Sequence, residues 1–194
     1  MDLIVDAVEQ QQLLRLARAA IENRLLGKPI PAPDSRWQRV AAAFVTLRDE
    51  GQLRGCIGYL ETDRRLAEVV TRCAVAASTS DPRFPSVGAE ELPRLRIEIS
   101  VLGPIEPTSS PTDFEVGRHG LIVRRGVHRG LLLPQVALEC EWDRETFLTQ
   151  TCLKAGLPGD AWKAGAQVFR FEADVFSEQE PAALPATLSM FGDS

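Results

Sequence analysis

The residues best suited to chemistry lie in one hexamer, Leu53-Arg54-Gly55-Cys56-Ile57-Gly58. Cysteine is a nucleophile in its thiolate form, and a neighbouring guanidinium favours that form. Strand alternation predicts that Arg54, Cys56 and Gly58 share one face. Glycines within a strand are typical of places where a ligand or another backbone approaches closely. The pattern predicts a reactive thiol at Cys56 or, because free cysteine is often buried, an inert core residue.

Two residues later in the chain could assist such a thiol. His119 lies between Gly117 and Gly120 at the start of a predicted strand, and histidine can take up a proton near neutral pH. Glu139 follows an apolar run and could orient His119, which would complete a Cys-His-Glu set. The alternatives are an exposed loop for His119 and a solvated helix face for Glu139.

Other polar residues could bind a substrate. Arg83 lies in a stiff loop between Pro82 and Phe84-Pro85, which suits a clamp for a carboxylate or phosphate. Alternatively, Arg83 and Asp81 form a structural loop that closes the preceding helix. Gln135 could donate to a substrate carbonyl or fix the turn at Pro134. The candidate binding residues are therefore Arg54, Gly55, Gly58, Arg83 and Gln135.

Composition narrows the classes of partner. The 194 residues are 44% hydrophobic and 25% charged, which is typical of one globular domain or two small lobes. The net charge of -5 argues against nucleic acid, although residues 118–129 are basic and could contact nucleic acid or an acidic partner. The same stretch could equally be a solvated hairpin face.

The cysteines and the hydropathy pattern bear on cofactors and location. The four cysteines contain no CxxC and no usual metal-ligand spacing, so we expect neither a metal nor another cofactor. Acids near Met1 replace the basic residues of a secretory signal, and no apolar run is long enough to span a membrane. We therefore expect a soluble, cytoplasmic protein.

Apolar periodicity predicts the elements that position these residues. Helices are expected at 13–25, after Asp63 to about 79, and from Asp143 as N-cap to about 155. Strands are expected at 40–47, 52–60, 95–102 and 167–176, with a hairpin over 120–133 and a loose tail over 177–194. Because hairpins dominate, the expected class is α+β with antiparallel sheets.

Several blocks, in the same order, carry a resemblance to a known family. They are Phe44-Val45-Thr46-Leu47, the Cys56 hexamer, Asp81-Pro82-Arg83-Phe84-Pro85, residues 97–102, 119–123 and 130–137, then Glu139 and Trp142, and residues 152–158 before Trp162. On these blocks the sequence resembles the AMMECR-type domain family. In bacteria and archaea such proteins resemble component A of the AmmeMemoRadiSam system, which is encoded beside a Memo-like protein and a radical SAM protein.

The resemblance implies two lobes, each on an antiparallel sheet, with the Cys56 hexamer facing the cleft between them. The larger lobe would hold residues 1–102 and 166–177, the smaller lobe 103–165, and the tail 178–194. The resemblance implies no reaction, so two hypotheses remain. One is thiol-based modification of an unknown small molecule or protein by Cys56. The other is a non-catalytic module that docks a Memo-like or radical SAM partner across the same cleft.

Overall fold

The computed structural model describes residues 4–34 and 37–178. Its helices are α1 (Ala7–Leu25), α2 (Leu66–Thr79), α3 (Pro134–Glu139) and α4 (Arg144–Lys154), with a short 3-10 helix at Ala89–Glu91. Its strands are β1 (Ala43–Asp49), β2 (Gln52–Tyr59), β3 (Leu95–Leu102), β4 (Glu106–Pro107), β5 (His119–Arg125), β6 (His128–Leu132) and β7 (Gln167–Ser177). Most of the expected tail, residues 179–194, lies outside the described residues.

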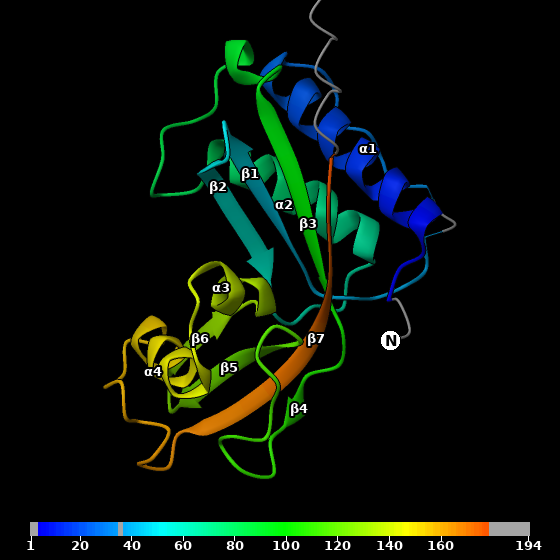
Figure 1. Cartoon of the computed structure of the whole chain (residues 1–194). Coiled ribbons are helices and arrows are strands. Elements are labelled where there is room, and N and C mark those ends of the chain that lie inside the picture. Colours follow the sequence, from blue (N-terminus) through cyan, green and yellow to red (C-terminus); the bar gives the residue numbers. More distant parts are fainter. Residues whose placement is uncertain (1–3, 35–36, 179–194) are drawn as a thin grey trace, which may run out of the picture.

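All seven strands form one curled antiparallel sheet with the order β2-β1-β3-β7-β5-β6, and β4 pairs with β7. Strand β7 runs through the whole molecule: residues 173–177 pair with β3, and residues 167–172 pair with β5 (Figure 1). The α+β class and the antiparallel pairing are thus confirmed. The division into two lobes stays a prediction, because one strand belongs to both halves.

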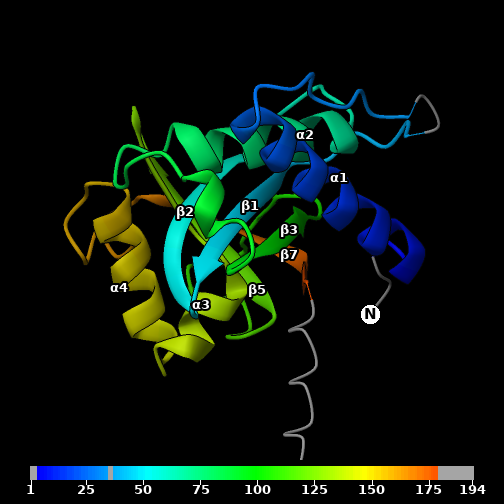
Figure 2. The same ribbon diagram turned by 90° about the horizontal axis from the view of Figure 1, so that it is seen from above.

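Helices cover one face of the sheet. α1 and α2 lie side by side over β1, β2 and β3 (Figure 2). Alternate strand residues face these helices, such as Val45 and Leu47 of β1 and Ile99 of β3, and all three are fully buried. In the other half, α4 packs Phe147 and Leu148 against Leu121 and Val123 of β5. No helix in the described part of the chain combines the length and apolar character of a membrane span.

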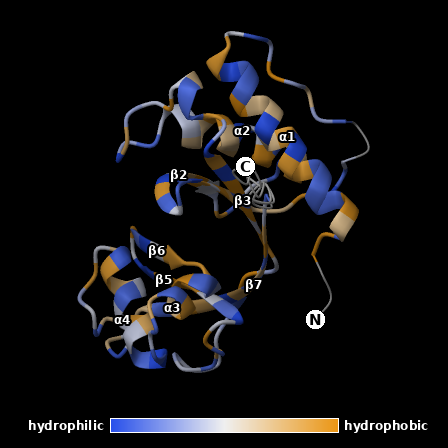
Figure 3. Cartoon of the chain, turned by 45° about the horizontal axis from the view of Figure 1, so that its top comes forward, coloured by the Kyte–Doolittle hydropathy of each residue, from blue (hydrophilic) through white to orange (hydrophobic). Residues whose placement is uncertain are grey.

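The opposite face of the sheet, here called the concave face, curls so that its two halves face each other (Figure 3). A separate apolar cluster fills part of this space, with Leu102, Ile122 and Phe171 buried at its centre. The ends of the sheet are also tied together, because Arg129 of β6 donates to Glu61 beyond β2 at 2.9 Å. The concave face is therefore partly core and partly polar surface.

The starts of the helices show which N-caps the local sequence predicts correctly. Asp143 caps α4 as expected, accepting from the Thr146 backbone N–H at 2.8 Å. Asp63 does not cap α2, which begins after Arg65 without a side-chain cap. α1 begins earlier than its apolar stripe because Asp6 and Glu9 form a capping box.

Gly55 explains how closely α2 approaches the sheet. A Cβ at this position would lie 2.2 Å from the Ala77 carbonyl oxygen of α2. Only a residue without a side chain permits this contact between a strand and helix backbone. Gly55 therefore serves the packing of the helix face and lies away from the concave face.

We predict that Gly55→Ala lowers the free energy of unfolding by about 1–3 kcal/mol, because the backbone of α2 must move. Urea denaturation measures the loss. Gly88→Ala is the matched control, since its Cβ would meet only the carboxylate of the exposed Glu90, which can swing away. The control should change stability by less than about 0.5 kcal/mol. Equal losses in both variants would contradict the packing argument.

Candidate functional site

Cys56 projects from β2 onto the concave face and is half-buried. It is in register with Thr46 of β1, whose hydroxyl donates to the Cys56 Sγ at 3.3 Å. Burial raises the pKa of the Cys56 thiol, and it outweighs the opposing effects of the Thr46 hydroxyl and the Arg83 guanidinium. The shift of the Cys56 pKa is therefore opposite to the one that a stabilised thiolate needs.

The backbone of Cys56 is fixed by side chains, because β2 is an edge strand. Its N–H donates to Asp81 Oδ2 at 2.8 Å, and Arg83 donates to its carbonyl oxygen at 3.3 Å. Asp81 is buried and forms an ion pair with Arg83 at 2.7 Å, which holds the pKa of the Asp81 carboxyl well below its usual range. Arg83 thus belongs to the structural loop that follows α2, one of its two predicted roles.

Three polar residues from other elements join Cys56 and Thr46 on the concave face. Glu98 of β3 is in register with Thr46, and Ser100 lies two residues further along β3. Gln135 of α3 reaches both, with its Nε2 3.4 Å from Glu98 Oε1 and 3.4 Å from Ser100 Oγ. The structure therefore places Gln135 on the concave face over β3, which is separated from β2 and Cys56 by one strand, β1.

We call this surface the Cys56 face. It comprises Thr46, Cys56, Glu98, Ser100 and Gln135, with Arg48 and Glu139 at its rim. Arg48 lies between two carboxylates, 3.9 Å from Glu98 and 3.5 Å from Glu139. Glu139 is therefore an Arg48 partner at the end of α3.

His119 does not complete the expected Cys-His-Glu set. It is in register with Glu172 of β7, whereas Cys56 is in register, through Thr46 and Glu98, with Ser177. These β7 positions are five residues apart, which is about 17 Å along a strand and an odd number of side-chain alternations. His119 therefore faces the opposite side of the sheet and cannot act as the base for Cys56.

His119 has its own surroundings. Its Nδ1 accepts from the Glu115 backbone N–H at 3.0 Å, and its Nε2 lies 3.9 Å from Glu172. With Arg118 and Arg170 it lines a cavity of about 340 Å³. Both arginines are already paired with carboxylates, Arg118 with Glu172 and Arg170 with Asp113.

Arg54 is directed away from the Cys56 face. The β1–β2 register shifts between Leu47 and Arg48, so Arg54 is the unpaired residue of a bulge and leaves the expected alternation. Its guanidinium pairs with Glu91 at 2.7 Å and donates to the Pro85 carbonyl. Arg54 therefore fixes the loop after α2 and does not activate the thiol.

Gly58 lies on the concave face but beneath a ring of the protein itself. A Cβ at Gly58 would lie 2.2 Å from the ring of Phe44, its register partner. The close approach that the glycines predict is thus made by Phe44 at Gly58 and by α2 at Gly55. Neither glycine provides space for a substrate.

Thr46, Glu98 and Ser100 were not identified as site residues from the sequence. Alternation within 95–102 places Glu98 and Ser100 on one side of a strand, and this signal was present. It becomes a site only through the β1–β3 register and through α3, neither of which local patterns reveal. Among the described residues, no group of three or more metal-binding side chains comes together.

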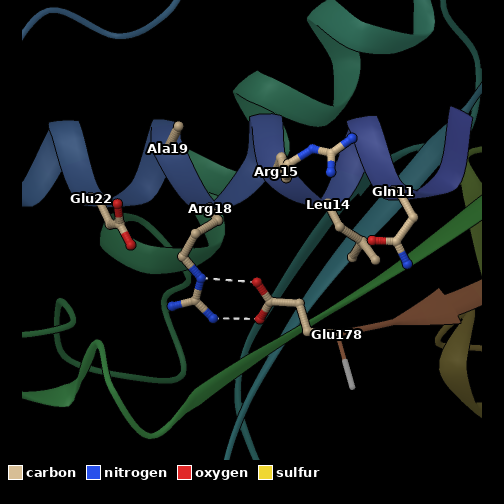
Figure 4. Close-up of a pocket in the computed structure, with 7 residues that line it drawn as sticks. All are labelled: Gln11, Leu14, Arg15, Arg18, Ala19, Glu22 and Glu178. Atoms are coloured by element: carbon tan, nitrogen blue, oxygen red, sulfur yellow. Dashed lines mark hydrogen bonds and ion pairs between the residues drawn. The ribbon is translucent and has the colours of Figure 1, made fainter. Parts of the chain in front are cut away.

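Another depression, along α1, is structural (Figure 4). Its central ion pair joins Arg18 to Glu178, just beyond β7, with Arg18 Nε donating to Glu178 Oε1 at 2.9 Å. Arg18 also donates to the carbonyls of Leu92 and Leu95. These bonds fasten α1 to the ends of β3 and β7.

Comparison with known proteins identifies the family of this chain. The AMMECR1 family model matches residues 14–176. The chain belongs to the AMMECR1 family. It is 48% identical over 182 residues to a protein of Methanothermobacter thermautotrophicus, covering 88% of this chain and 94% of that protein. It is 44% identical over 185 residues to a protein of Methanosarcina acetivorans, covering 89% and 93%.

A solved structure has the same fold. The crystal structure of the uncharacterised protein PH0010 from Pyrococcus horikoshii is similar with a TM-score of 0.83 and 42% identity. The similarity covers 89% of this chain and 92% of that chain. The fold of this chain is therefore similar to that of PH0010.

We predict that in this AMMECR1 protein the alkylation rate of Cys56 rises with a midpoint above the ordinary thiol pKa of about 8.5, because burial disfavours the thiolate. Mass spectrometry of the native protein against pH measures it, with the exposed Cys140 as an internal reference for the reagent. Thr46→Val should raise the midpoint further, because the hydroxyl that donates to the sulfur is lost. His119→Ala should leave it unchanged. A midpoint below the ordinary value would overturn this description.

Proposed function

We propose that this AMMECR1 protein is a non-catalytic binding module that docks a partner protein on the Cys56 face. The observation that carries the proposal is the environment of Cys56: its side chain is half-buried, its sulfur receives a hydrogen bond from Thr46, and burial raises the pKa of its thiol. A nucleophilic thiol needs a lowered pKa or an adjacent base. Cys56 has neither among the described residues that contact it.

The residues that were expected to activate the Cys56 thiol contact other groups. Arg54 pairs with Glu91, and His119 lies on the other face of the sheet. Glu139 pairs with Arg48 at the rim. The hypothesis of thiol-based modification of a small-molecule or protein substrate would need these groups to converge on the sulfur. It is therefore the outcome that the experiments must distinguish from docking.

The Cys56 face has the character of a contact surface. Over the buried hydroxyls of Thr46 and Ser100 it combines amide, carboxylate and guanidinium groups with an exposed apolar residue, Val175. Val175 of β7 lies directly opposite Ser100 of β3, so both side chains point to the same side of the sheet. Mixed polar and apolar surfaces of this kind are typical of non-obligate protein interfaces.

The proposed partners follow the resemblance to component A of the AmmeMemoRadiSam system. We propose a Memo-like protein and a radical SAM protein, which would act with this protein in the cytoplasm. The proposal needs no cofactor on this chain, because the surface alone makes the contact.

We expect Val175→Trp to abolish the capture of a purified Memo-like or radical SAM protein, because the indole projects into the Cys56 face. Val127→Trp is the control, because Val127 is also an exposed valine but lies in the turn of the β5–β6 hairpin. Cys56→Ser should keep capture, because serine preserves size and needs no thiolate. Affinity capture with purified proteins measures all three.

Two results would contradict the docking proposal. One is unchanged capture by Val175→Trp, which would place the interface elsewhere. The other is loss of capture in Cys56→Ser with an unchanged melting temperature, which would favour the hypothesis that the Cys56 thiol takes part in a reaction.

A further inference from the structure

Glu98 is short of hydrogen-bond donors compared with equally buried carboxylates. Its side chain is 18% exposed, and its nearest donors are Gln135 Nε2 at 3.4 Å and Arg48 Nε at 3.9 Å. Glu91 is 17% exposed and receives bonds of 2.7 and 3.0 Å from Arg54 and 2.7 Å from Gly88. A carboxylate with so little solvent contact needs donors, and Glu98 lacks close ones.

Glu178 is a second carboxylate of similar burial that receives close donors, unlike Glu98. Glu178 accepts two bonds from Arg18 (Figure 4). It is 21% exposed and also accepts a bond from the Ile97 backbone N–H at 3.0 Å. Arg18 engages it through two guanidinium nitrogens, as a fork. Glu98 is as buried as Glu91 and Glu178, but no arginine donates two close hydrogen bonds to its carboxylate.

Gln135, which contacts Glu98, also has an acceptor oxygen that lacks a hydrogen-bond donor. Its Nε2 is shared between Glu98 and Ser100 at long distances, while its Oε1 is buried with no hydrogen-bond partner. Two neighbouring side chains therefore both offer acceptor oxygens without matching donors. A poorly solvated acceptor without a donor is costly, and because the Glu98 side chain is still 18% exposed, an occupant that supplies donors to Glu98 is favoured.

The charge of the Cys56 face favours a cation. Its rim and floor hold two carboxylates, Glu98 and Glu139, against one guanidinium, Arg48. Arg48 approaches Glu98 only to 3.9 Å because it is also drawn to Glu139 and to the Gly51 carbonyl. Among the described residues of this face, the carboxylates therefore outnumber the guanidinium groups by one.

We infer that the partner presents an arginine side chain to Glu98, and that its guanidinium forms the fork that Glu91 and Glu178 receive within this chain. A planar guanidinium matches both carboxylate oxygens, which a single ammonium cannot do. This inference deepens the docking proposal and rests on it. It makes Glu98 the specificity-determining residue of the Cys56 face.

The test uses a small probe, Nα-acetyl-arginine methylamide, titrated into the full chain by NMR up to about 20 mM. The corresponding citrulline amide is the control, because it has the same shape and a neutral urea. We expect saturable shifts around Cys56 and Glu98 with the arginine probe and at least fivefold weaker binding of the citrulline probe, about 1 kcal/mol. The lysine analogue should bind more weakly than the arginine probe.

Two variants of this chain should change binding in opposite directions. Glu98→Gln should weaken the arginine probe about fivefold, because the charge is removed without changing the shape. Arg48→Met should strengthen it about threefold, because the resident cation no longer competes. The melting temperatures of both variants establish that they are folded.

The inference is overturned if the arginine probe shows no saturable binding, if arginine and citrulline bind equally, or if Glu98→Gln has no effect. Its failure is distinguishable from failure of the docking proposal. If only the inference fails, Val175→Trp still abolishes capture of the partner while the probe shows no preference for charge. If docking on this face fails, Val175→Trp leaves capture intact.

Discussion

The pairing of β7 with two different sets of strands determines the shape of this protein. Residues 173–177 of β7 extend the sheet of β3, β1 and β2, while residues 167–172 extend that of β5 and β6. One continuous strand therefore makes the two halves a single curled sheet, with α1, α2 and α4 on one side and a concave face on the other. The Cys56 face lies on that concave side, where α3 carries Gln135 to β3.

Local signals predicted much of this architecture. Alternation within 95–102 matches β3, and the cap at Asp143 matches the start of α4. The α+β class follows from the hairpins. What local signals could not predict is register: the bulge beside Arg48 turns Arg54 toward Glu91, and an odd spacing along β7 sends His119 to the opposite face. Both depend on long-range pairing.

The hexamer around Cys56 illustrates how one pattern can serve two purposes. Its glycines predicted a close approach, and the approaching groups are the α2 backbone at Gly55 and the Phe44 ring at Gly58. Its cysteine predicted reactive chemistry, yet burial raises the pKa of the thiol. What a partner can reach on this face includes the partly exposed carboxylate of Glu98, whose nearest donors are Gln135 Nε2 at 3.4 Å and Arg48 Nε at 3.9 Å.

The most direct measurement of the central claim is the alkylation rate of Cys56 in the complex with the captured partner. If the partner docks on the Cys56 face, the rate at Cys56 falls sharply on binding and recovers when excess salt or a competing arginine probe releases the partner. If Cys56 reacts at the same rate in the free protein and in a complex of demonstrated stoichiometry, the interface lies elsewhere and the account is contradicted.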